Sequence, residues 1–338
     1  MSPEERSLND STFSEIRTFT TVAEIESIPG FLPNNPVDKT NYKEILGDSD
    51  LDEEILCCLR KDNGNLCAEG HAHGWVVRLF DGTVTVIGRD CAKDKFELDA
   101  KLSKDSRIFN TQKLRKNKLS RLFDYLADRE VAETSLSRIQ DKVLEIKNRL
   151  ESFEREIGSK NLSRLRDMAR GGSGVVSITA ITIVPYIDDE GERAEERRAV
   201  GKRLGSLRGI ELFRPENVDT ILSGVRDVHL AYRHAAAQAV VEKPKADEIE
   251  RLVAIFARSE QLPKELERLR ALDFAFHASD FTLLCYLSDD RVERYRAAGI
   301  AMRSLGITGG RERAKIWLAS IDARYKVEFG AQQLRIGV

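Results

Sequence analysis

Long apolar runs, proline and histidine are scarce in this chain of 338 residues, which has only 8 prolines and 5 histidines. No apolar run approaches the ~18–20 residues that a membrane-spanning helix requires, so we expect no membrane partner. The first ten residues, MSPEERSLND, are polar and acidic and do not resemble a secretory signal, which predicts a cytoplasmic protein. With 41% hydrophobic and 33% charged residues, the composition favours long, solvated helices over one large core.

Familiar catalytic motifs are also missing. The sequence has no HExxH, GxSxG or Walker pattern. The glycine-rich stretch 171–174 is not followed by Gly-Lys-Ser/Thr, so it indicates a linker and not a phosphate-binding loop. The sequence therefore favours a role other than enzymatic catalysis.

The formal net charge is only −2, but the charges are unevenly distributed along the chain. Residues 1–56 carry 13 acidic and 4 basic residues, whereas residues 92–121 carry 10 basic and 4 acidic residues. Such asymmetry is typical of an interaction surface, although a solvated helix face also explains it. A further explanation is that the acidic N-terminal segment covers the basic stretch in the folded chain.

Four of the five cysteines fall between residues 57 and 91, and two of them are adjacent. An odd count with this clustering does not suit a disulfide framework. In a reducing compartment, clustered cysteines more often bind a metal ion.

The same segment contains two of the five histidines, which suggests a zinc site, since zinc in proteins takes four thiolate or imidazole ligands. The predicted ligands are one of Cys57 and Cys58, then Cys67, one of His71 and His73, and Cys91. Our preferred set contains Cys58 and His73, because Cys58 is nearer the following turn and His73 precedes a glycine. Both histidines could also ligate, since residues two apart on a strand share a face.

A β-hairpin brings the two ends of this segment together. Trp75–Phe80 and Thr83–Ile87 are β-rich runs on either side of Asp81-Gly82, a strong hairpin signal. A helix is expected to begin near Asp90, whereas Leu51–Arg60 suggests an earlier helix. Over residues 57–96, this arrangement resembles a treble-clef zinc finger, without its C-x-x-C knuckle and without a second ligand in the Cys91 helix.

Two other interpretations of the cysteines remain open. The thiols could simply be buried beside surface histidines. Alternatively, Cys91 at a helix start could be a nucleophile with a nearby histidine as its base.

Residues 96–170 are predicted to be almost entirely helical. Within them, apolar residues recur at alternating intervals of three and four, which predicts a coiled-coil-like helix. These residues are Leu136, Ile139, Val143, Ile146, Leu150, Phe153 and Ile157. The partner of this seam is either another helix of the same chain or a second protein, including a second copy.

We expect a mainly α protein with a small β component and an α-helical C-terminal domain. In that domain Val175–Ile187 predicts a strand, Asp188–Arg203 an exposed loop or short helix, and Gly209–Phe213 a second strand, giving a short two-stranded element. The predicted segments are an acidic N-terminal segment, a zinc module, a long helical region and a strand-then-helical domain, at 1–50, 51–96, 97–170 and 171–338.

The basic stretch after the zinc module predicts a function. A small rigid module that positions a basic helix is a common way of contacting phosphates. The residues expected to bind nucleic acid are Lys113, Arg115, Lys116, Lys118 and Arg121. The alternative is a protein-interaction scaffold that self-associates or docks through residues 136–157, with zinc purely structural.

Overall fold

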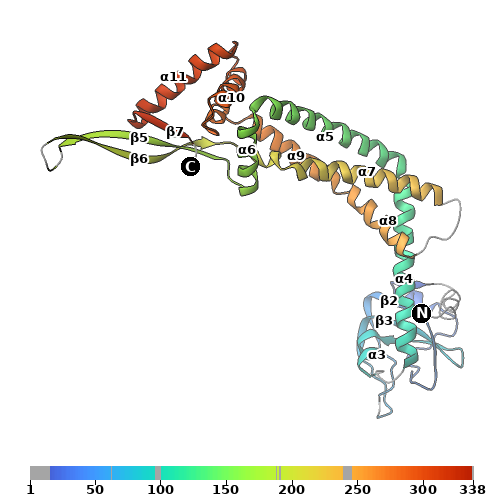
Figure 1. Ribbon diagram of the computed structural model, residues 1–338. Helices are drawn as coiled ribbons and strands as arrows, with labels where there is room; N and C mark the ends of the chain where they lie inside the picture. Colours follow the sequence, from blue (N-terminus) through green and yellow to red (C-terminus); the bar gives the residue numbers. More distant parts are fainter. Residues whose placement is uncertain are drawn as a thin grey trace. The chain divides into compact units, whose positions relative to one another are not determined.

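The computed structural model describes residues 16–61, 63–95, 100–187, 189, 192–238 and 246–336 (Figure 1). Residues 1–15 of the expected acidic segment therefore lie outside the described chain. The chain divides into two compact units, the first ending at Phe123 and the second beginning at Asp124. Among the described helices, none is long and apolar enough to span a membrane.

The first unit is a four-stranded sheet followed by helices. Its strands lie in the order β1-β2-β3-β4, with β1 parallel to β2 and the other neighbours antiparallel. Its elements are β1 (Arg17–Phe19), α2 (Val22–Glu26), β2 (Tyr42–Leu56), β3 (Gly70–Leu79), β4 (Val84–Gly88), α3 (Arg89–Lys95) and α4 (Ala100–Ala127), the last of which ends in the second unit.

The predicted hairpin is confirmed as β3 and β4. Gly82 adopts φ +87°, a conformation that glycine tolerates without steric cost, and Asp81 accepts hydrogen bonds from the backbone N–H and hydroxyl of Thr83. This turn reverses the chain, so that the residues before β3 and after β4 lie at one end of the sheet.

Helix α4 packs on this sheet through its first four turns. Phe109 meets Trp75 edge to face, with ring centroids 5.5 Å apart, and the Tyr42 hydroxyl donates to Asp105 at 2.9 Å. The side of α4 that carries Phe109 therefore faces the sheet.

The expected helix over Leu51–Arg60 is wrong, because residues 42–56 form strand β2. Its pairing with β3 is irregular between Asp50 and Ile55, where three consecutive acidic residues bulge out of register. Residue 50 thus lies inside a strand, and the sheet extends across the expected boundary between the first two segments.

The second unit is mainly helical, with one three-stranded sheet in the order β6-β5-β7. Its elements are α5 (Arg129–Ile157), α6 (Ser159–Gly171), β5 (Val175–Ile187), β6 (Arg193–Ser206), η1 (Ile210–Phe213), α7 (Pro215–Gln238), α8 (Ala246–Ser259), α9 (Leu262–His277), η2 (Phe281–Tyr286), α10 (Arg291–Ser304), α11 (Arg311–Phe329) and β7 (Gln333–Ile336). Together the two units make a mainly α protein with a small β component, as predicted.

Helix α5 carries the predicted heptad seam, and that seam is occupied within the chain. Leu136, Ile139, Val143 and Ile146 are all buried, and α5 packs against α7 and α9 (Figure 1). Phe153 extends this core by meeting Phe276 of α9 edge to face at 5.2 Å.

The small sheet of the second unit differs from the expected short two-stranded element. Val175–Ile187 is a strand as predicted, but it pairs over its whole length with β6, which occupies most of the segment expected to be loop. The expected second strand at Gly209–Phe213 is instead the 3-10 helix η1, and β7 supplies the third strand.

Candidate metal centre

Cys57 and Cys67 face each other across a narrow loop after β2. The backbone N–H of Cys57 donates to the carbonyl of Glu69 at 2.9 Å, and that of Cys67 donates to the carbonyl of Leu59 at 2.7 Å. Ala68, next to Cys67, adopts φ +54°, which turns the chain sharply toward β3. The loop therefore fixes the two thiols by main-chain bonds.

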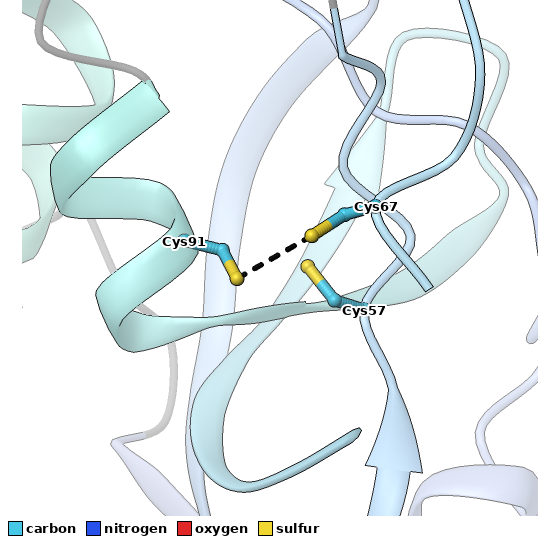
Figure 2. Close-up of side chains that lie close together, drawn as sticks. All are labelled: Cys57, Cys67 and Cys91. Carbon is cyan, nitrogen blue, oxygen red and sulfur yellow. Dashed lines mark hydrogen bonds between the residues drawn. The ribbon is translucent and has the colours of Figure 1, made fainter. Parts of the chain in front are cut away.

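Cys91 reaches the same place from the other end of the hairpin, because it lies in the first turn of α3, directly after β4. Its Sγ is 3.5 Å from that of Cys67, and the three Sγ atoms of Cys57, Cys67 and Cys91 all lie within 4.8 Å of one another (Figure 2). Cys57 and Cys67 are buried, and Cys91 is half-buried.

These three thiols can hold a metal ion. A tetrahedral zinc ion with Zn–S bonds of ~2.3 Å places its sulfur ligands ~3.8 Å apart, close to the 3.5 Å between Cys67 and Cys91. In addition, the backbone N–H of Gly88 donates to Cys57 Sγ at 3.3 Å, the kind of outer bond that orients a thiolate ligand. All three cysteines are free thiols, so a metal ion can bind without breaking a disulfide.

The electrostatics of the cluster favour protonated thiols as long as no cation is present. Burial raises the pKa of the Cys57 thiol. Two causes raise the pKa of the Cys91 thiol: burial, which is the larger, and the hydrogen bond with Cys67. This disfavours Cys91 as a nucleophile, because the reactive species is the thiolate. A bound divalent cation reverses the preference, since it replaces the protons of its ligands.

His71 lies beside this cluster and has no partner of its own. Both of its ring nitrogens are buried and lack a hydrogen bond in the described structure, and burial lowers its pKa. A Cβ atom added at Gly88 would meet the imidazole ring at 3.1 Å and Cys91 Sγ at 3.5 Å, and one added at Gly74 would meet Nδ1 at 2.9 Å. The two glycines therefore leave room for this ring next to Cys91.

The structure differs from the preferred ligand set at Cys58 and His73. Cys58 is outside the thiol cluster, and its Sγ lies 3.6 Å from the carbonyl of Leu56. The His73 side chain is 67% exposed, and its Nδ1 lies 2.9 Å from Asp50. Cys57, which the sequence offered as an alternative to Cys58, lies in the cluster. His71, the alternative to His73, lies beside Cys91 but is not among the residues whose ligand atoms all lie within 4.8 Å of one another. Adjacent residues of a strand point to opposite sides, and this alternation distinguishes Cys57 from Cys58. It could not be applied from the sequence because a helix was predicted over this segment.

The five basic residues predicted to bind nucleic acid divide into two groups on α4. Lys113 is half-buried and pairs with the buried carboxylate of Asp48, and the Lys116 ammonium donates to the backbone carbonyl of Ile16 at 3.0 Å. These two lysines therefore contact the N-terminal part of their own unit. This is the kind of contact expected if the N-terminal segment covers part of the basic stretch. Arg115 and Arg121 are exposed, and Lys118 is half-buried.

The exposed side of α4 carries a basic face. At about 100° per residue, Lys104, Arg107, Arg115, Lys118 and Arg121 fall within an arc of about 120°, whereas Lys113 and Phe109 fall on the opposite side. Among residues 100–123, the one acidic residue, Asp105, lies outside that arc. Lys104 and Arg107, which were not in the predicted set, lie on the same face at the helical period of 3.6.

Comparison of the chain with protein-family models, with curated proteins and with solved structures found no match.

Proposed function

We propose that the first unit holds a structural zinc ion through Cys57, Cys67, Cys91 and His71. The observation that carries this proposal is the convergence of three thiols from the two ends of one hairpin. Thiolate and imidazole are the ligands that zinc prefers, and four protein ligands close the coordination sphere, which is typical of structural sites and not of catalytic ones.

The zinc module then positions α4 for binding nucleic acid. Zinc ties β2, β3 and α3 together, and the sheet fixes α4 through Phe109 and Lys113 on one side of the helix. The opposite side presents five basic residues along ~26 Å of helix, at 1.5 Å per residue from Lys104 to Arg121. A row of cations on a rigid helix suits the regularly spaced phosphates of a nucleic acid.

A scaffold that self-associates through residues 136–157 has less support. Most apolar residues of that seam are already buried, and α5 packs against α7 and α9 of the same chain. A second copy would have to displace these helices before it could pair with α5.

Fluorescence anisotropy with labelled single- and double-stranded DNA and RNA tests the nucleic-acid proposal. For the full chain at about 50 mM salt we expect binding that falls steeply by about 200 mM. Reversing two charges on the basic face, in Arg115→Glu/Arg121→Glu, should weaken binding and reduce the salt slope by about two.

The matched control is Lys39→Glu/Lys43→Glu, which reverses two exposed charges of the same unit that are not part of α4. It should bind nearly as well as the unmodified protein. The proposal is wrong if no nucleic acid binds at the lower salt, or if both double variants weaken binding equally.

A further inference from the structure

Four arginines surround a hollow in the second unit, outside the metal centre and α4. The hollow has a volume of about 500 Å³ and lies where α6, the start of α7 and α9 meet. Its lining includes Arg166, Arg170, Arg214 and Arg268, with Glu216 as the one acidic residue among the lining side chains that the structure describes. A concave site with this excess of positive charge suits an anion.

Two of these arginines are held in place by the protein. Arg214 donates from Nε to the carbonyl of Ala169 at 2.7 Å, and Arg166 donates from Nη2 to Glu154 at 2.9 Å. The Nε atom of Arg166 is buried and has no hydrogen-bond partner in the described structure. A buried donor without a partner is rare in folded proteins, and Arg166 is one of the side chains that line the hollow.

The other two arginines are available to a ligand. Arg170 is 75% exposed and approaches Asp167 only to 3.4 Å, and Arg268 is exposed on α9. Planar guanidinium groups donate in pairs to phosphate oxygens, which makes arginine the usual residue at phosphate sites. The hollow therefore combines two fixed and two adjustable guanidinium groups.

A second hollow of about 210 Å³ adjoins the first and shares Glu216, Asn217 and Arg268 with it. Its lining is more apolar and includes Ile221, Leu269 and Leu272. It also contains Glu265, whose Oε2 atom is buried without a hydrogen-bond partner in the described structure. Because Glu265 is part of this lining, its carboxylate offers an acceptor to a ligand, and an apolar wall suits a flat ring.

From these two hollows we propose a binding site for a phosphate ester whose organic part carries a ring N–H donor, of which a nucleoside monophosphate is the simplest example. The phosphate lies among Arg166, Arg170 and Arg268. The ring lies against Leu269 and donates its N–H to Glu265.

Isothermal titration calorimetry on the full chain at low salt tests this site with guanosine monophosphate, ribose 5-phosphate and guanosine. Guanosine monophosphate should bind more tightly than either fragment. Arg170→Gln/Arg268→Gln should weaken guanosine monophosphate and ribose 5-phosphate by about tenfold or more, since each charge-assisted hydrogen bond contributes appreciably to affinity. Glu265→Gln should weaken guanosine monophosphate and leave ribose 5-phosphate unchanged.

The control is Arg251→Gln, an exposed arginine of α8 outside both hollows, which should leave all affinities unchanged. The site is disproved if none of the three probes binds at millimolar concentration, or if Arg170→Gln/Arg268→Gln behaves like Arg251→Gln. If Glu265→Gln leaves guanosine monophosphate binding unchanged, the ring half of the proposal is wrong.

Discussion

At the scale of single residues, the direction of one side chain decides which of two adjacent cysteines can bind a metal ion. The backbone is extended where β2 ends, so neighbouring side chains point to opposite sides. Cys57 consequently points toward Cys67 and Cys91, whereas Cys58 is outside this group of thiols, although both belong to the hydrophobic core of the first unit. Both are almost completely buried, at 1% and 2% exposed, so burial alone does not distinguish them.

This difference gives a sharp prediction for metal content. We expect about one zinc ion per chain after dialysis against a weak chelator, as for other closed four-ligand sites. Cys57→Ser should lose most of that zinc, because it removes a thiolate ligand, whereas Cys58→Ser should retain it. Elemental analysis of the purified proteins measures both. Equal loss in the two variants would contradict the assignment of Cys57.

The two histidines supply the control for the fourth ligand. His71→Ala should reduce zinc affinity, since it removes the buried imidazole beside Cys91. His73→Ala should not, because that ring is exposed and pairs with Asp50. A larger loss of zinc affinity in His73→Ala than in His71→Ala would instead identify His73, which the sequence favoured, as the fourth ligand.

At the scale of secondary-structure elements, sequence patterns were reliable only where one face of an element is buried. The heptads of α5 and the hairpin around Gly82 each show the periodicity of their element, and the predictions of a helix and of a hairpin were correct. The pattern of β2 fails because its bulge between Asp50 and Ile55 breaks the alternation of two. Strand β6 is exposed on both faces over most of its length, so no apolar alternation marks it.

The seam of α5 also shows what a heptad pattern cannot specify, namely its partner. Ile146 is 3% exposed and packs within the second unit, so Ile146→Asp places a charge in the core. We expect this change to lower the free energy of unfolding by ~3–5 kcal/mol, independently of protein concentration. Denaturant titrations at several protein concentrations measure this free energy of unfolding.

The matched control is Leu144→Asp, two residues away on α5, where the side chain is 37% exposed. This substitution should lower the free energy of unfolding much less than Ile146→Asp does. A dimer seen by light scattering that Ile146→Asp alone dissociates would show that the seam pairs between chains after all.

At the scale of the whole molecule, the two compact units depend on different stabilising interactions. The proposed zinc ligands all lie in the first unit, between residues 57 and 91. The second unit has its own aromatic core around Phe153, Phe213 and Phe276, far along the sequence from any of those ligands. Removing the metal should therefore affect one unit and spare the other.

We predict that chelation unfolds or loosens the first unit while the second stays folded. Zinc binding contributes ~10–16 kcal/mol of apparent free energy in small zinc modules, as much as the ~5–15 kcal/mol by which a typical domain is stable. Hydrogen exchange after treatment with a strong chelator should show lost protection in β2, β3 and β4 and unchanged protection in α5, α7 and α9. Adding zinc back should restore the protection of β2, β3 and β4. Protection that persists in β2–β4 after complete removal of zinc would mean that the thiol cluster contributes nothing to the folding of its unit.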